Sequence, residues 1–111
     1  MTVIDKATFE ELKQMSGAEF IGELIDAFLE EAPAMIQNMQ AALAKQDVDS
    51  FRRNAHSLKS NANTFGALEL GALARELEAM ARESNLDIGN RLDVLEEAFG
   101  RVAAELKGIR T

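Results

Sequence analysis

Apolar residues recur at steps of three and four along most of the chain, the spacing that places them on one face of an α-helix. The clearest stripe is Phe51, Ala55, Leu58, Ala62 and Phe65. The 111 residues include one proline and seven glycines but no tyrosine or tryptophan, and this composition suits neither a strand-rich sandwich nor a disordered linker. The pattern therefore predicts an all-α protein.

Capping residues and breaks divide the first part of the chain into two helical elements. A short helix opens with Asp5 as its N-cap, ends at Ser16-Gly17, and has an inner face of Phe9, Leu12 and Met15. The second element runs from about Ala18 to Lys45, and its helical spacing continues through Pro33. Because proline removes one hydrogen bond, we expect a kinked helix or two abutting ones. Its apolar stripe is Ile21, Leu24, Phe28, Ala32, Met35, Met39 and Ala42.

Three further helices complete the predicted fold. Gln46-Asp47 supplies a break and an N-cap for a helix over about 48–65, which Gly66 ends. Two later stripes follow, separated by a turn at 84–87: Leu70, Leu73, Leu77 and Met80, then Ile88, Leu92, Leu95, Phe99, Val102 and Leu106. Short connections favour antiparallel neighbours. We expect one domain over residues 1–111, an up-down-up-down four-helix bundle with a short N-terminal accessory helix.

Charge and composition exclude several classes of partner. The net charge of −7 repels polyanions, so we expect no nucleic-acid partner. Without cysteine the chain has neither disulfides nor thiolate zinc sites. No apolar run approaches the roughly 20 residues that span a bilayer, and the N-terminus lacks a signal-peptide pattern. We expect a cytoplasmic monomer without membrane association.

The single histidine, His56, is the strongest candidate for chemistry. At about 100° per residue it lies outside the apolar stripe, in one sector with Arg52, Lys59, Ser60 and Asn63. An imidazole among cationic and small polar groups could serve proton, metal or phosphoryl chemistry. Periodicity alone equally allows an ordinary solvated face.

Three chemistries fit the neighbours of His56 poorly. A metal site needs several histidine, cysteine or carboxylate ligands, and this turn offers only cations and amides. Serine-type hydrolysis needs an acid that orients the ring, and we expect no carboxylate in that place for Ser57 or Ser60 to use. Nucleotide binding needs a glycine-rich loop after a strand, whereas Gly66 and Gly71 are isolated.

The segment that contains His56 resembles the signature of the histidine-containing phosphotransfer (HPt) domains of bacterial phosphorelays. It reads Ala55-His56-Ser57-Leu58-Lys59-Ser60-Asn61-Ala62-Asn63-Thr64-Phe65-Gly66-Ala67. The family has a histidine, a lysine three residues later, small residues next, and a glycine ten residues after the histidine. Three flanking segments are similar as well: 28–33 (Phe-Leu-Glu-Glu-Ala-Pro), Asp47, and 73–78 (Leu-Ala-Arg-Glu-Leu-Glu).

The resemblance implies that His56 carries a phosphoryl group, on the ring nitrogen farther from the backbone, and that Lys59 faces this group. It implies a phosphocarrier without autokinase activity or a cofactor of its own, in which Mg²⁺ is bound by the partner receiver domain. Many members have glycine after the lysine, where this chain has Ser60. Partners would be response-regulator receiver domains and hybrid histidine kinases. We expect the partner-binding residues to be Arg52, Ser60, Asn63, Gly66, Leu29 and Ile25, although Leu29 and Ile25 fit a core role equally well.

Two other functions stay open on the sequence alone. One is a noncatalytic helical adaptor that binds receiver domains without carrying phosphate. The other is the excised module of a larger hybrid sensor kinase, which would use the same chemistry.

Overall fold

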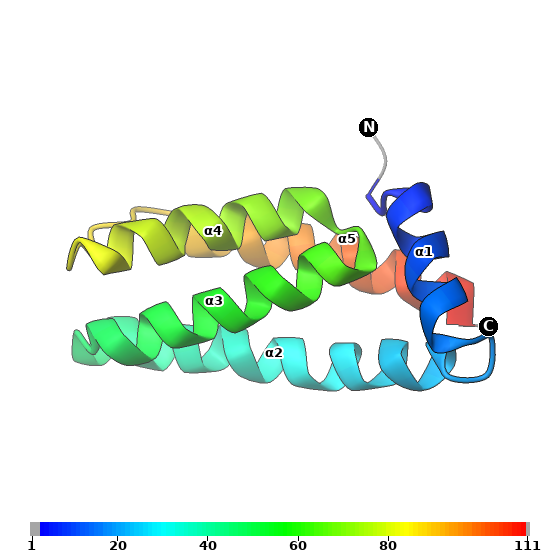
Figure 1. The fold of residues 1–111 in the computed structure, drawn as a ribbon. Coiled ribbons are helices and arrows are strands. Elements are labelled where there is room, and N and C mark those ends of the chain that lie inside the picture. Colours follow the sequence, from blue (N-terminus) through cyan, green and yellow to red (C-terminus); the bar gives the residue numbers. More distant parts are fainter. Residues whose placement is uncertain (1–2, 111) are drawn as a thin grey trace.

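The computed structural model describes residues 3–110, and these fold into five α-helices without a strand. The helices are α1 (Lys6–Ser16), α2 (Ile21–Lys45), α3 (Val48–Phe65), α4 (Leu68–Arg82) and α5 (Arg91–Arg110). The predicted all-α class is confirmed. In Figure 1, α2, α3, α4 and α5 run lengthwise beside one another, and α1 lies across one end.

The first helix begins and ends where the sequence predicts. The Asp5 carboxylate accepts hydrogen bonds from the Thr8 N–H and hydroxyl, and Gly17 follows the last helical residue. Phe9 is buried and Leu12 is half-buried, but Met15 is exposed. The inner-face prediction is therefore wrong for Met15, because α1 covers the end of the bundle with one narrow stripe only.

The second helix starts later than predicted, and two of the seven residues in its predicted stripe are not buried. Phe20 donates its backbone N–H to the Gly17 carbonyl in a turn before the helix, so residues 18–20 precede α2. The helix continues through Pro33, and the alternative of two abutting helices is wrong. Ile25 and Ile36 are buried in place of Leu24, which is exposed, and Met35, which is half-buried.

The third helix matches its predicted bounds and buries the whole predicted stripe. Asp47 caps its start by accepting from the Ser50 N–H, and Gly66 ends it with φ of 85°. Stripe residues from Phe51 to Phe65 are all buried. In α4 and α5 most predicted apolar positions are buried, with Leu73, Met80 and Phe99 only half-buried. Ile88 is buried but lies in the link before α5.

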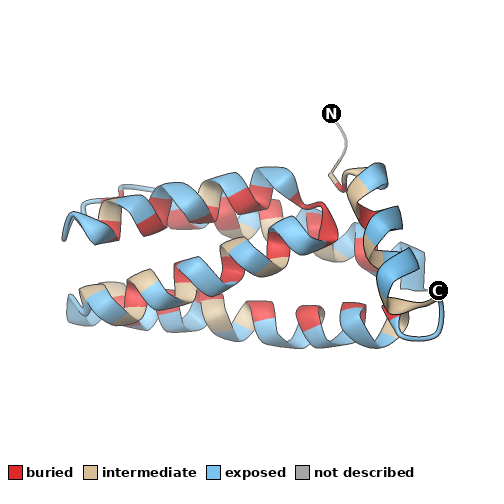
Figure 2. Cartoon of the chain, viewed as in Figure 1, coloured by how far each residue is buried: buried red, intermediate tan, exposed pale blue. Residues whose placement is uncertain are grey.

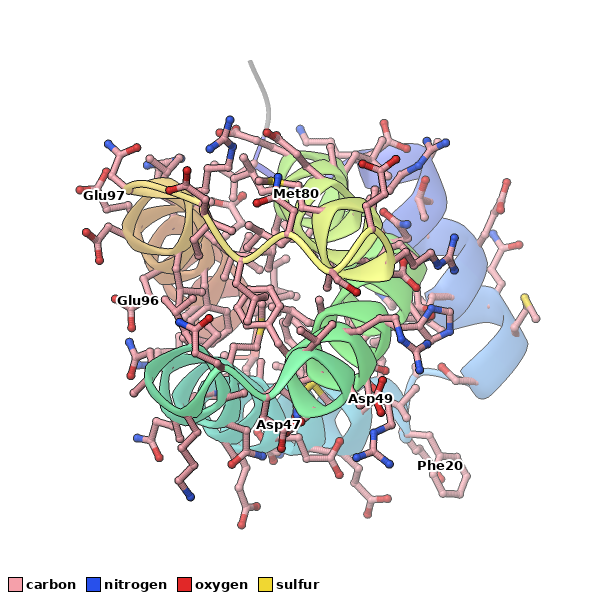
Figure 3. The ribbon with its side chains drawn as sticks, turned by 90° about the vertical axis from the view of Figure 1, so that its left-hand side faces the viewer. Phe20, Asp47, Asp49, Met80, Glu96 and Glu97 are labelled. Carbon is pink, nitrogen blue, oxygen red and sulfur yellow. The ribbon has the colours of Figure 1, made fainter. Side chains whose placement is uncertain are left out.

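The buried residues of the long helices face one another. Buried positions form stripes along the inner sides of the helices in Figure 2, and side chains fill the space between the four helices in the end-on view of Figure 3. The ring centroid of Phe28 lies 5.0 Å from that of Phe65 and 5.9 Å from that of Phe99. One apolar core thus joins α2, α3 and α5 and holds α3 in a fixed orientation.

Candidate functional site

His56 lies near the middle of α3, on the side turned away from the core. Its side chain is 54% exposed, while Ala55 and Leu58 beside it are buried. The amphipathic pattern of α3 produces this arrangement, because burying the stripe turns the opposite sector of the helix outward. The predicted exposure of the ring is confirmed.

A buried carboxylate from the neighbouring helix holds the ring. The Nδ1 atom of His56 lies 2.7 Å from Oε2 of Glu78 on α4. Glu78 is only 3% exposed, and it is the one buried charged side chain among the described residues. The expectation that no carboxylate orients the ring is therefore wrong: the orienting acid comes from another helix, 22 residues along the chain.

Two cations share the same carboxylate. Lys59 donates its Nζ to Oε1 of Glu78 at 2.7 Å, and Arg82 donates a guanidinium N–H to Oε2 at 3.0 Å. Burial alone would raise the pKa of Glu78. The hydrogen bonds from Lys59 and His56, with the positive charges of Lys59 and Arg82, outweigh that effect and hold the pKa below its usual value. Glu78 is therefore ionised at neutral pH.

This contact determines which ring nitrogen is available for chemistry. A carboxylate can only accept a hydrogen bond, so in the neutral ring the proton lies on Nδ1 and the lone pair on Nε2. Within residues 3–110, Nε2 makes no hydrogen bond. The site is an exposed imidazole in a fixed tautomer, suited to nucleophilic attack through Nε2.

The structure distributes the other predicted site residues over several places. Lys59 joins His56 at Glu78, Ser60 and Asn63 are exposed further along α3, and Arg52 is half-buried one turn before His56. Leu29 is half-buried on α2.

Two of the predicted partner-binding residues are not on the surface. Ile25 is only 1% exposed, so its alternative core role is the correct one. Gly66 is buried against α1, where its carbonyl accepts the Asp5 N–H at 2.8 Å. Both residues contribute to the interior packing of the fold and are inaccessible to a partner.

Sequence reasoning missed Glu78, although a signal was present. Gly71, Ala74, Glu78 and Ala81 are buried together and follow steps of four and three along α4. A single carboxylate within an apolar stripe must find partners inside the fold, since an unpaired buried charge is very costly. This position therefore indicates an ion pair with another element.

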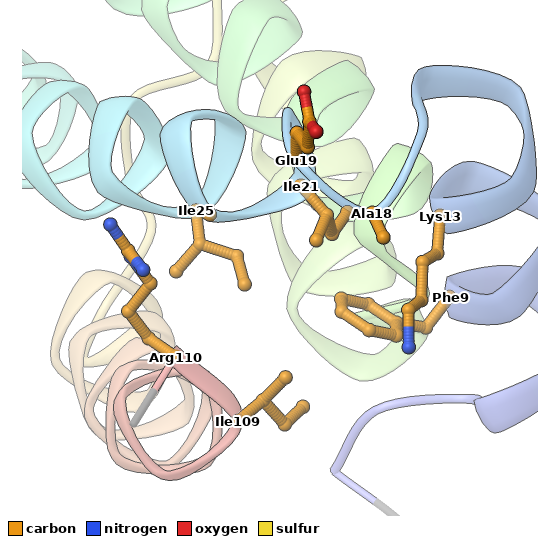
Figure 4. A pocket seen from close by; sticks show the side chains of 9 residues that line it. Phe9, Lys13, Ala18, Glu19, Ile21, Ile25, Ile109 and Arg110 are labelled. Atoms are coloured by element: carbon orange, nitrogen blue, oxygen red, sulfur yellow. The ribbon is translucent and has the colours of Figure 1, made fainter.

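Neither of two hollows at the end of the bundle reaches the histidine. One of about 280 Å³ lies between α1, the start of α2 and the end of α5, with Phe9, Ile25 and Ile109 among its lining residues (Figure 4). A neighbouring hollow is lined by residues of α1 and α5 together with Ile4. Over the described part of the chain, no three or more histidine, cysteine or acidic side chains gather to form a metal site.

Most of the chain matches one known family. A family model described as "Hpt domain" matches residues 23–109. The chain belongs to the Hpt domain family. Membership supports phosphotransfer in two-component phosphorelays as the function class of this Hpt domain.

Solved structures share the fold of this Hpt domain. The crystal structure of histidine-containing phosphotransfer protein B (HptB) from Pseudomonas aeruginosa PAO1 is similar with a TM-score of 0.89 at 24% identity, over 97% of this chain and 94% of that one. The HPT domain of an Hpt sensor hybrid histidine kinase from Shewanella has a TM-score of 0.77 at 15% identity, over 96% of this chain and 92% of that one.

A curated relative is much longer than this Hpt domain. Over 75 residues the chain is 31% identical to the sensor protein TorS of Escherichia coli (strain K12). The aligned segment covers 68% of this chain but only 8% of the sensor. Within residues 3–110, none of the helices combines the length and apolar character needed to cross a membrane.

Proposed function

We propose that this chain is a histidine phosphotransfer protein that relays a phosphoryl group between aspartates of receiver domains through phospho-His56. The observation that carries the proposal is the 2.7 Å contact between Nδ1 of His56 and the buried Glu78, which leaves Nε2 open on an exposed ring. The family membership supports the same function.

In the proposed step, the Nε2 lone pair forms a bond to the phosphorus of an aspartyl phosphate. The bond from phosphorus to the aspartate oxygen breaks, and its electron pair leaves on the aspartate carboxylate. The ring keeps its Nδ1 proton and gains positive charge during the attack. The ionised Glu78, which accepts that proton's hydrogen bond, stabilises this charge, as an acid behind a catalytic histidine does. Transfer to the next receiver is the reverse of these steps.

Lys59 is the proposed partner of the phosphoryl oxygens. Phosphoryl transfer depends mainly on in-line positioning and on cations near the equatorial oxygens. The ammonium of Lys59 and the ring of His56 bind the two oxygens of one carboxylate, so both groups lie at the same place on the surface. We assign Mg²⁺ and the remaining charge neutralisation to the receiver domain.

A groove at the C-terminal end of α3 supports a docking surface for the receiver. His56, Ser60 and Thr64 follow one another at steps of four along α3, about 12 Å in total. Thr64 lines a groove between α1, α2 and α3, whose other lining residues include Leu12, Leu24 and Ala27. We call three features together the docking surface: the row His56, Ser60 and Thr64 on α3, the groove, and Phe20. Phe20 is exposed, and its ring projects away from the helices in Figure 3.

Two finer points belong to the same proposal. The course of the chain in Figure 1 and the short links support an up-down-up-down order of α2, α3, α4 and α5. The match to a short part of TorS supports the related case in which this chain acts as a module of a hybrid sensor kinase. That case uses the same residues and the same step.

Incubation of the chain with a panel of phosphorylated receiver domains tests the function. The wild type should become labelled, and the label should be acid-labile and base-stable, as a phosphoramidate bond requires. His56→Gln should stay unlabelled. A wild type that accepts no label from any receiver, or a labelled His56→Gln protein, would contradict the proposal.

Leu24→Asp tests the docking surface in the same assay. Because Leu24 is 38% exposed, the change should slow labelling by a receiver about 10-fold without unfolding the chain. Labelling by phosphoramidate, which needs no docking, should keep its wild-type rate. The control is Val94→Asp, an equally exposed residue on α5, which should behave as the wild type with both donors. Equal slowing by the two variants would exclude this surface.

A further inference from the structure

We propose that Arg82 is a positioning residue that keeps Glu78 paired while Lys59 turns from the carboxylate to a phosphoryl group on His56. The inference rests on the proposed function and adds a conformational step to it. It concerns an exchange of counter-ions around one buried charge.

The need for this step follows from how the two carboxylate oxygens are shared. Among the described residues, Oε1 of Glu78 accepts from Lys59 alone, and Oε2 accepts from His56 and Arg82. When Lys59 turns to the phosphoryl group, Oε1 loses its hydrogen bond and Glu78 loses one of its positively charged partners. Removing one partner of a buried ion pair is strongly destabilising, because the other charge stays buried without compensation. Lys59 is therefore held to Glu78 unless another cation takes its place.

Arg82 is placed to do this. It lies four residues after Glu78 on the same helix, so its backbone stays within reach of the carboxylate whatever Lys59 does. Its side chain is 61% exposed and therefore has room to shift. A guanidinium has five N–H donors in a planar fork and can bind both oxygens of a carboxylate at once. By moving from one oxygen to both, Arg82 would replace the bond that Lys59 gives up.

This exchange gives Arg82 an effect on the stability of phospho-His56 without contact to the phosphoryl group. With Arg82 in place, Lys59 is free to neutralise the phosphoryl oxygens. Without it, Lys59 stays with Glu78, and the phosphorylated state is less favourable relative to phosphate on the receiver aspartate.

The test is the equilibrium constant for sharing phosphoryl groups with one receiver that labels the wild type. The ratio of phosphorylated to unphosphorylated forms is measured for both proteins at fixed Mg²⁺. Arg82→Met should shift this constant toward the receiver by about 3-fold to 10-fold, the range expected for losing one ordinary intramolecular hydrogen bond. Arg82→Lys, which keeps the charge but lacks the fork, should fall between the wild type and Arg82→Met.

A double-mutant cycle identifies the route of the effect. Lys59→Ala should also lower the constant, and adding Arg82→Met to Lys59→Ala should change nothing further, because no lysine is left to release. The control is Arg101→Met, which removes an arginine from an exposed pair with Glu69 and should leave the constant at its wild-type value. Circular dichroism confirms that each variant is folded.

Three results would overturn the inference while leaving the proposed function intact. The first is an unchanged constant in Arg82→Met, even if the rate of transfer falls, because a docking role alters rates and not the equilibrium between free proteins. The second is an equal effect of Arg82→Met with and without Lys59. The third is an equilibrium constant in the Arg82→Lys variant that equals the wild-type value. A wild type that accepts no phosphoryl group from any receiver would contradict both the proposed function and this inference.

Discussion

Glu78 is a carboxylate in the interior of a small helical protein, and it is stable there because three donors surround it. His56, Lys59 and Arg82 each contact one of its oxygens at 2.7 to 3.0 Å. Buried charges persist where partners and hydrogen bonds compensate for the lost water. At the residue scale, the same contacts that satisfy this charge select the tautomer of His56 and hold Lys59 beside it.

The lowered pKa of Glu78 makes stability depend on pH in the acidic range. Burial opposes ionisation, but the bonds from Lys59 and His56 prevail, so the folded pKa lies below the unfolded one. The unfolded state therefore binds more protons between the two values, and stability rises with pH across that window. The contribution is complete above the unfolded pKa of about 4.3 and is lost as pH falls through the folded pKa. The free energy of unfolding by urea should decline accordingly below about pH 5.

Glu78→Gln assigns this dependence to the residue. The free-energy difference between wild type and variant should be largest near pH 6 and should shrink toward pH 3. The pKa of Asp5 is lowered too, by hydrogen bonds from the Thr8 hydroxyl and N–H, but both proteins share that contribution and it cancels. The control is Glu76→Gln. Glu76 lies on α4 like Glu78, but it is exposed and pairs with Arg91 of α5. A difference that stays constant with pH would show that the charge of Glu78 is not stabilising.

At the scale of elements, Gly66 joins the end of α3 to the start of α1. It ends α3 with φ of 85°, a backbone conformation that residues with a Cβ rarely adopt. Its carbonyl accepts the N–H of Asp5, the N-cap of α1. A Cβ at this position would lie 2.7 Å from the Asp5 carbonyl oxygen. The glycine is required because the backbone of α1 approaches the end of α3 at this point.

Gly66→Ala should lower the free energy of unfolding by about 1 to 3 kcal/mol, since it adds both backbone strain and a clash with α1. Gly100→Ala is the matched control, because a Cβ there meets nothing within 4 Å and the residue lies inside α5. That change should stabilise the protein by roughly 0.5 to 1 kcal/mol, the helix propensity of alanine over glycine. Thermal and urea unfolding followed by circular dichroism measure both, and two changes of the same sign would contradict this account.

At the scale of the whole molecule, the rings of Phe28, Phe65 and Phe99 connect α2, α3 and α5. Phe65 occupies the last turn of α3 and is buried against Phe28. This contact fixes the rotation of α3, and with it the side on which His56 faces outward. The core thus positions the histidine through the helix that carries it.

Phe65→Ala should lower the free energy of unfolding by about 3 to 5 kcal/mol, the usual result of removing a buried phenylalanine ring. Phe20→Ala removes an exposed ring of the same size and should change it by less than about 1 kcal/mol. Urea unfolding of the two variants side by side measures the difference. Similar small effects would mean that Phe65 does not contribute to the core as described.

Local patterns were sufficient for the presence of the helices, for the bounds of α3 and for the exposure of the histidine. Capping by Asp5 and Asp47, the stop at Gly66 and the stripe of α3 involve residues within a few positions of one another. Single buried positions on the other helices were harder to predict, because several adjacent apolar residues compete for one buried face. On α2, neighbours in the bundle favoured Ile25 and Ile36 over Leu24 and Met35, and no local interaction decides such a choice.

The amino-acid sequence by itself determined the helical class, the ends of α3, and the placement of His56 and Lys59 outside its apolar stripe, because turns of one helix depend only on residues three and four apart. Only the tertiary structure decided what surrounds the imidazole. Glu78 comes from α4, 22 residues after His56, and it meets the ring because the packing of α4 against α3 buries the carboxylate between the two helices, where Arg82 of α4 also contacts it. A contact between separate helices depends on how both are rotated, and that rotation is set by the whole core.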